Sequence, residues 1–285
     1  MKSKKSGQIL ILVLLIVVVS LAVGLSVASR NLTNLKISTQ TEQSQRAFSA
    51  AEGGVEDVLS RLNTIKQDSQ VLESGGLDVP VDVGDIRATV NVKGRNVYET
   101  VDPIPLGEIA QINLVVNPST GTKYSGNVTV EWLKNDDPYS AIELTFICEG
   151  SGSYDCAGST VSGTYSQNRL AFSSDNRPPS EPEPQGFVVC PNSPCSSAGT
   201  TYKWKWSFNT GGNVRLMRIK SFDKPVRVRV SGEIANPLPT QIYEINYVAK
   251  TEIGITRKVQ VTRTVLPALP AVFDYVLYSE GDIVK

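Results

Sequence analysis

The chain has 285 residues, with 28 basic and 28 acidic side chains and no histidine. The balanced charge excludes a global electrostatic field that would draw the protein to nucleic acid, so we expect no nucleic-acid partner. The missing histidine removes the commonest general base and metal ligand, and with it every Ser-His-Asp or Cys-His catalytic arrangement. These totals predict a protein that is not an enzyme and that holds no cofactor or metal.

The N-terminal quarter of the chain is free of helix breakers, because all sixteen prolines lie at or after Pro80. Residues 9–28 carry no charge, and fifteen of these twenty are Ile, Leu or Val. A helix of this length spans the ~30 Å hydrocarbon core of a bilayer. Lys2, Lys4 and Lys5 precede it. The positive-inside rule therefore predicts a single span in the cytoplasmic membrane, with the N-terminus inside and the remainder exported.

A cleaved secretion signal is the alternative for this segment, because Ser26 to Ala28 form a small-residue cleavage site. The following stretch favours one continuous helix instead, since apolar residues recur there at intervals of three and four. We expect the helix to run over residues 8–66, half in lipid and half projecting. The residues of the expected packing stripe are Phe48, Ala51, Val55, Val58, Leu59, Leu62 and Ile65.

The basic leader MKSKKSG, the apolar helix and the motif QRAFSAAEGGVEDVL resemble type IV pilin-like proteins, particularly the PilX-like minor pilins. The resemblance covers about residues 4–62. It implies that residues 1–7 are a leader removed by a prepilin peptidase between Gly7 and Gln8, and that Gln8 is then N-methylated. It also implies that the helices bundle, with Glu52 of the motif among the packing residues. The implied partners are other pilins and the pilus assembly machinery, in a filament at the cell surface.

Two positions depart from the family pattern. Major pilins usually begin with Phe or Met, where this chain has Gln8. They also usually carry a glutamate at the fifth mature position, which is thought to neutralise the N-terminal amine of a neighbouring subunit, and Leu12 occupies that position here. An unpaired buried charge costs several kcal/mol. The resemblance therefore fits a minor or tip subunit, or pseudopilin, better than the repeating subunit. A membrane protein that never polymerises is the alternative.

The remainder, residues 67–285, is expected to form an exported β-rich head. Segments of alternating polar and apolar residues predict half-buried strands between clusters of turn residues. The fold class expected for the whole chain is therefore α+β, a long N-terminal helix followed by a mainly antiparallel, β-sandwich-like head. The predicted strands are 86–92, 108–116, 127–133, 141–148, 202–208, 214–219, 226–230, 242–250 and 256–265.

The four cysteines form two close pairs, Cys148 with Cys156 and Cys190 with Cys195. Each pair can close a local disulfide in an oxidising compartment. A zinc site of four thiolates and free thiols are the alternatives, although the first pair is spaced too widely for a common zinc motif. The apolar stretch 273–278 is expected to pack on the head or to dock a partner pilin.

These features together predict a minor pilin that assembles into or at the tip of a filament and displays its head for assembly or adhesion. Two other classes remain open. One is an anchored or secreted β-domain that binds a surface ligand such as a polysaccharide. The other is an anchored hydrolase with two catalytic carboxylates, which needs no histidine.

Overall fold

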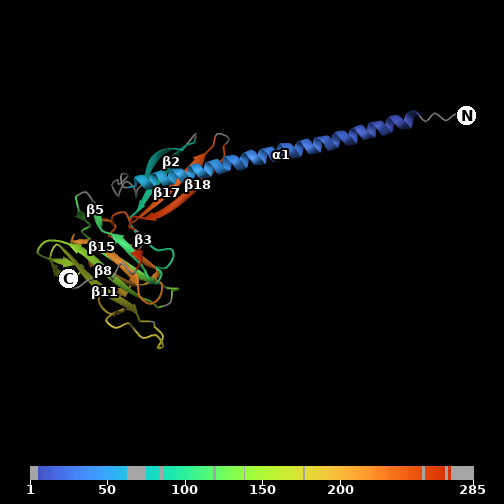
Figure 1. The fold of residues 1–285 in the computed structure, drawn as a ribbon. Coiled ribbons are helices and arrows are strands. Elements are labelled where there is room, and N and C mark those ends of the chain that lie inside the picture. Colours follow the sequence, from blue (N-terminus) through green and yellow to red (C-terminus); the bar gives the residue numbers. More distant parts are fainter. Residues whose placement is uncertain are drawn as a thin grey trace, which may run out of the picture. The chain divides into compact units, whose positions relative to one another are not determined.

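The structure is a computed structural model of the whole chain. The residues that it describes are 6–62, 75–83, 86–117, 120–137, 139–175, 177–251, 254–266 and 269–270. Its one long helix, α1, spans Ser6–Arg61, which corresponds to about 84 Å at 1.5 Å per residue. Mostly antiparallel sheets follow (Figure 1). The expected α+β class, with a long helix and a β-rich head, is confirmed.

The chain divides into two compact units. The first contains Met1–Thr64, Asp78–Val90 and Asn246–Gln260, and the second contains Ile65–Leu77, Asn91–Ile245 and Val261–Lys285. A head that begins at residue 67 was expected, but strand residues from two distant parts of the sequence group with the helix instead. The physical reason is that the C-terminal half of α1 has an apolar face, which must be covered by other apolar residues.

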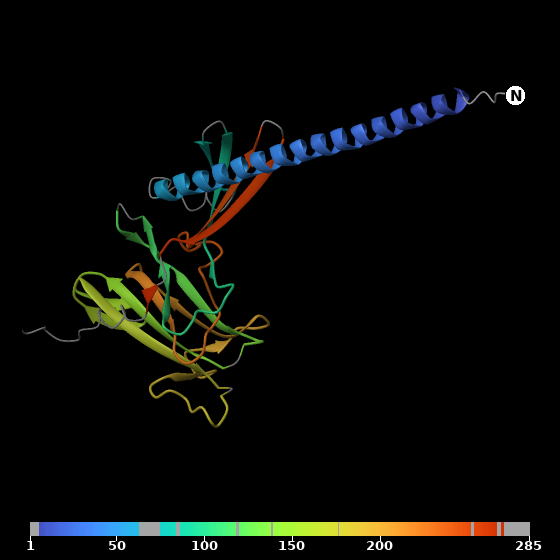
Figure 2. The same ribbon diagram turned by 45° about the vertical axis from the view of Figure 1, so that its right-hand side comes forward.

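A four-stranded sheet with the order β1-β2-β17-β18 supplies the strand residues of the first unit. In Figures 1 and 2, α1 crosses β17 and β18. The buried apolar residues described in this unit come from the helix and from Val79, Val81, Val90, Tyr247 and Ala249. The strands are β1 (Leu77–Val83), β2 (Ile86–Arg95), β17 (Ile242–Lys250) and β18 (Thr256–Thr264).

The second unit contains a six-stranded sheet with the order β12-β11-β8-β15-β4-β19. Its neighbours are antiparallel except for β11 and β12, which run parallel. Its strands are β4 (Glu108–Asn113), β8 (Ala141–Glu149), β11 (Tyr165–Ser174), β12 (Val188–Cys190), β15 (Val214–Ser221) and β19 (Leu269–Pro270).

A five-stranded antiparallel sheet with the order β13-β14-β7-β16-β3 completes the core of this unit. Two separate two-stranded sheets, β5-β6 and β9-β10, also belong to this unit. The strands are β3 (Tyr98–Glu99), β7 (Asn127–Lys134), β13 (Ser196–Ser197), β14 (Tyr202–Asn209) and β16 (Val228–Ser231). The two-stranded sheets are β5 (Val115–Asn117) with β6 (Thr122–Lys123), and β9 (Ser153–Cys156) with β10 (Ser159–Ser162).

The two larger sheets pack face to face through aromatic side chains. Trp132 of β7 lies 5.4 Å from Phe172 of β11, measured between ring centroids. Phe146 of β8 lies 5.8 Å from Trp206 and 4.9 Å from Phe208, both on β14. All five rings belong to one buried cluster. Aromatic pairs at these separations add to the free energy gained by burying their area, so this layer is the core of the sandwich.

Each of the nine predicted strands falls on an observed strand. The longer strands β1 and β11 were not predicted, nor were the strands of two to four residues β3, β6, β9, β10, β12, β13 and β19. Pro80 lies within β1. Proline is rare inside strands, so this segment was not predicted to be one. Strand β11 is mainly polar, and its buried residues are confined to its last three positions. Its place in the sheet comes from pairing with β8 over nine residues rather than from its own apolar pattern.

Candidate functional site

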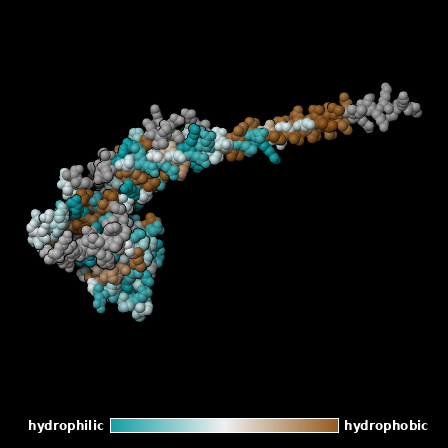
Figure 3. Space-filling view, in the orientation of Figure 1, coloured by the Kyte–Doolittle hydropathy of each residue, from teal (hydrophilic) through white to brown (hydrophobic). Residues whose placement is uncertain are grey.

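The first part of α1 is apolar and uncovered. From Leu10 to Val27 the large apolar side chains are between 53% and 72% exposed. Figure 3 shows this stretch as a brown rod. Among the described residues, α1 is the one helix long and apolar enough to cross a membrane. Gly7 and Gln8, which flank the expected cleavage bond, lie in the first turn of α1.

The second part of α1 has one buried face, which we call the covered face. Four residues of the expected stripe lie on it, and three small residues that were not expected complete it. Leu59 is half-buried beside it. Phe48 is 48% exposed and Glu52 is exposed, while Ile65 lies outside the described residues. The covered face consists of Ala47, Ala50, Ala51, Gly54, Val55, Val58 and Leu62.

The small residues of the covered face let the helix approach the sheet closely. A Cβ atom placed on Gly54 would lie 2.2 Å from Cε2 and 2.7 Å from Cδ2 of Tyr247. Tyr247 on β17 is fully buried. Burial raises the pKa of its hydroxyl group, because the ionised form is disfavoured away from water. Ten residues before Gly54 on the helix, the Ser44 hydroxyl accepts a hydrogen bond of 2.8 Å from the Arg257 Nε–H of β18.

Two local disulfides join the cysteines in the pairs that the sequence suggests. Cys148 is bonded to Cys156, and Cys190 is bonded to Cys195. All four cysteines of the sequence lie in the described part of the chain and are paired in this way. All four residues lie in the core cluster of the second unit. Among the described residues, no group of three or more His, Cys, Asp or Glu side chains is arranged to hold a metal ion.

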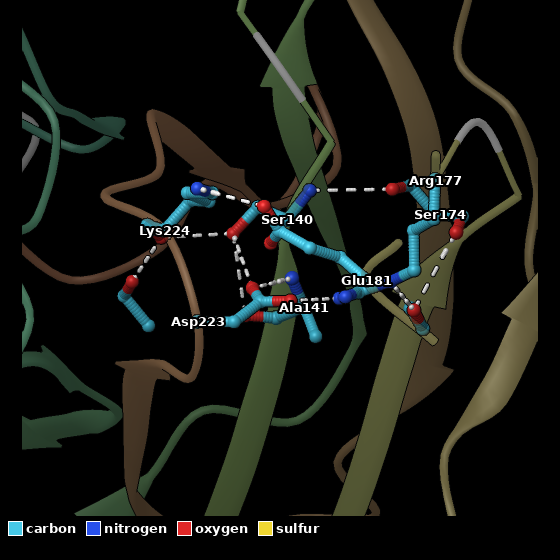
Figure 4. Close-up of polar contacts among 9 residues, drawn as sticks. Ser140, Ala141, Ser174, Arg177, Glu181, Asp223 and Lys224 are labelled. Atoms are coloured by element: carbon cyan, nitrogen blue, oxygen red, sulfur yellow. Dashed lines mark hydrogen bonds and ion pairs between the residues drawn. The ribbon is translucent and has the colours of Figure 1, made fainter. Parts of the chain in front are cut away.

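A polar cluster lies at one end of the sandwich, where β8 begins and β15 ends (Figure 4). Asp223 is its centre. Its Oδ1 atom accepts a hydrogen bond of 2.8 Å from the Ala141 N–H, and its carboxylate forms an ion pair with Arg177. The Arg177 side chain is 6% exposed. The Ser140 hydroxyl donates to the carbonyl oxygen of Lys224 at 2.9 Å.

The cluster also holds the proline-rich loop that follows β11. The Arg177 guanidinium lies 5.1 Å from the ring centroid of Tyr139, and the Lys224 ammonium lies 5.3 Å from it. Lys224 also pairs with Glu181 of the loop at 3.5 Å. The hydrogen bond to Glu181 raises the pKa of Tyr139. These charges face one another across two loops, so we interpret the cluster as a brace that fixes the loop to the strand ends.

A row of charged residues, separate from the polar cluster, crosses the five-stranded sheet. Arg229 on β16 lies opposite both Glu131 on β7 and Glu99 on β3. Its guanidinium pairs with the Glu131 carboxylate at 3.2 Å, and the Tyr202 hydroxyl donates to Glu99 at 3.2 Å. Burial, and then the negative charge of Glu99, raise the pKa of Tyr202 well above its usual value. Alternating charges on neighbouring strands stabilise a sheet, so this row has a structural explanation.

The sequence therefore identified the helix and the cysteine pairs, but it missed three of the small residues of the covered face (Ala47, Ala50 and Gly54) and both charge clusters. Ala and Gly carry no strong apolar pattern, and the partners in the charge clusters are far apart in sequence. The apolar stretch 273–278 lies outside the described residues. None of the protein-family models, curated proteins or solved structures compared with this chain matches it.

Proposed function

We propose that the protein is a minor pilin or pseudopilin, a structural subunit that assembles through α1 into or at the tip of a type IV pilus-like filament. The observation that carries the proposal is that one unbroken helix has an exposed apolar segment followed by a segment with a buried face. The apolar segment from Leu10 to Val27 is uncovered, whereas the segment from Ala47 to Leu62 is covered by strands of the same chain.

This division suits a subunit that changes its surroundings during assembly. Lipid first surrounds the apolar segment, because about twenty apolar residues match the bilayer core. Neighbouring helices then replace the lipid, at little cost in free energy, since both surroundings are apolar. The covered segment keeps the helix attached to its own strands throughout. The β-rich domain is thereby displayed for assembly or adhesion.

The motif that carries the family resemblance divides in the same way. Ala47, Ala50 and Ala51 belong to the covered face, and Phe48 and Glu52 point away from it. The alanines therefore serve the fold of the chain itself. Phe48 and Glu52 remain accessible to neighbouring helices. For Glu52 this is the packing role that the resemblance implies, whereas Phe48 was expected from its helical spacing to pack on the head. Leu12, 60% exposed, offers no carboxylate to a neighbouring N-terminal amine, which favours a tip position.

Shearing experiments on cells that express the chain test the proposal. The chain should appear with filaments in the sheared surface fraction. A Gly7→Asp variant, which is expected to resist the prepilin peptidase, should remain in the membrane fraction at a similar total amount. An Asn34→Asp variant, changed on an exposed helix position outside the cleavage site, serves as the control. A chain that stays in the membrane in every case, or a Gly7 variant that is sheared like the unchanged chain, would contradict the proposal.

A further inference from the structure

The six-stranded sheet has a second face, which points away from the core of the sandwich. Successive residues of a strand point to opposite faces of a sheet. Ala110, Ile219 and Leu144, which pair across β4, β15 and β8, belong to the core cluster, so the residues beside them in the sequence point outward. We call these outward residues the outer face. One row of it is Gln111, Arg218, Thr145 and Arg169, and the next row is Ile109, Lys220, Glu143 and Ala171.

The centre of the outer face is buried. Gln111, Thr145 and Arg218 are each at most 9% exposed. Ile109 is 1% exposed, although it does not belong to the core cluster. An antiparallel sheet that packs on the core with one face commonly leaves its other face in water. The five-stranded sheet packs on the inner face, so these four residues need a different cover.

The cover has to suit positive charges as well as apolar side chains. Arg218 is buried and Lys220 is half-buried on the neighbouring row. A buried guanidinium is stable only where it is paired and hydrogen-bonded, and both residues do take part in polar or electrostatic interactions. The carboxylate of the same row as Lys220, that of Glu143, forms an ion pair with Arg169 at 3.4 Å. A segment that brings carboxylates of its own, together with apolar residues for Ile109, therefore fits the outer face best.

The segment that follows β19 in the sequence has this composition. We call residues 271–285 the closing segment; they lie outside the described residues, and their sequence is AVFDYVLYSEGDIVK. The apolar stretch 273–278 is interrupted by Asp274 alone, and the whole segment carries three acidic residues and one basic residue. Its net charge is thus opposite to that of the two cations on the outer face, so the two are complementary in charge as well as in hydropathy.

The closing segment also starts at the right place and is long enough. In β19, Leu269 pairs with Ile109 and Pro270 pairs with Glu108, so the last described residues lie beside the outer face. Fifteen residues extend over up to about 50 Å. The distance across the sheet from β4 through β15 to β8 is only about 10 Å, two strand spacings. The outer face and the closing segment also belong to the same compact unit.

We propose that the closing segment folds back over the outer face of its own chain. Its apolar stretch packs on the row of Ile109, and its acidic residues approach Arg218 and Lys220. The outer face is then a docking surface for the chain itself, and the apolar stretch is not available to a neighbouring subunit. This inference concerns the second unit alone and does not depend on the proposed function.

Zero-length cross-linking of amines to carboxylates tests the contact in the full-length chain in detergent. A carbodiimide should join Lys220 to an acidic residue of the closing segment, which mass spectrometry of the peptides identifies. A mixture of isotope-labelled and unlabelled chains should give no mixed pairs, because the contact lies within one chain. Mainly mixed pairs would assign the outer face to a second copy. Lys220 joined to Asp68 or Glu73 instead would assign it to another segment, and either result, or no cross-link to residues 271–285, would overturn the proposal.

Two adjacent thiol reporters on β4 test the burial. Gln111→Cys lies on the outer face and Ala110→Cys lies in the core, and the native cysteines are all paired. Changing Phe273 and Leu277 together to Ser should speed maleimide labelling at position 111 about ten-fold, and position 110 should stay protected.

A matched control changes two exposed apolar residues elsewhere in the same unit. Val101→Ser with Leu106→Ser, at positions 83% and 53% exposed, should leave both labelling rates unchanged. An unchanged rate at position 111 in the Phe273 and Leu277 variant would overturn the proposal. Equally faster labelling at both positions would place the closing segment in the core rather than on the outer face, which would overturn it as well.

Discussion

The close approach of α1 to its sheet makes Gly54→Ala the most informative single substitution. The new Cβ atom would lie 2.2 Å from one ring carbon of Tyr247 and 2.7 Å from the next. Because Tyr247 is fully buried, its ring has no free space into which to turn. Overpacking of this kind costs about 3 kcal/mol. Replacing glycine by alanine in a helix returns about 1 kcal/mol, so the net loss is about 2 kcal/mol.

Hydrogen exchange measures this loss locally. Amides of α1 between Ala47 and Leu62 should exchange about 30-fold faster in the variant, since each 1.4 kcal/mol is a factor of ten. Amides of the sandwich should keep their rates. The double variant Gly54→Ala with Tyr247→Leu should recover part of the loss, because the smaller side chain relieves the clash. Unchanged or slower exchange in Gly54→Ala, or strictly additive effects in the double variant, would refute the packing argument.

Three further predictions concern the second unit. Replacing Cys148 and Cys156 by alanine should lower the free energy of unfolding by about 2.5 kcal/mol, the entropy lost by closing a short loop, as measured by denaturant titration. Asp223→Ala should cost about 3 kcal/mol in the same titration, because it leaves the buried guanidinium of Arg177 without its carboxylate. The raised pKa of Tyr202 stabilises the fold below about pH 10, and this contribution should be lost as the pH rises above that value. Tyr202→Phe should make unfolding less sensitive to pH in that range.

Matched variants control for these three results. Glu181→Gln breaks an ion pair of the same polar cluster whose two side chains are 37% and 46% exposed, and it should change stability by less than about 1 kcal/mol. If Glu181→Gln lowered the free energy of unfolding as much as Asp223→Ala, the burial of an ion pair would not determine how much stability its loss removes. For the disulfide, a reducing agent should bring the unchanged chain close to the alanine variant. For Tyr202, an identical alkaline slope in the Phe variant would assign that slope to other groups.

The sequence predicted the elements that depend on local patterns. The helix follows from its apolar run and the absence of proline before Pro80, and nine strands follow from their alternation. The strand order could not be predicted, because pairings such as β8 with β15 join segments some seventy residues apart, and no local pattern encodes the partner. Strand β11 was missed because most of its side chains are polar, so it lacks the alternating pattern. Its place in the sheet depends on a partner strand that no local pattern encodes.

Four residues of the covered face were predicted, Ala51 and three large apolar ones, whereas Ala47, Ala50 and Gly54 were not. Val55, Val58 and Leu62 can be recognised in the sequence because they are strongly apolar. Ala47 and Gly54 contribute to the covered face because their small size lets the helix approach the sheet closely. A small residue becomes informative only when the atom that approaches it is known, and Tyr247 lies almost two hundred residues away. Conversely, Phe48 is strongly apolar and was expected on the buried stripe, but it is 48% exposed. An apolar residue at helical spacing therefore does not by itself identify the covered face.

The state of the N-terminus tests the central claim, that this helix is processed and assembled as a pilin. Mass spectrometry of the protein from membranes and from sheared surface material gives its first residue and any modification. The account predicts a chain that begins at Gln8 with a methylated amine. A chain that begins near Ser29 would show a cleaved secretion signal, and a chain that retains Met1 would show an unprocessed membrane anchor. Either result would contradict the pilin assignment.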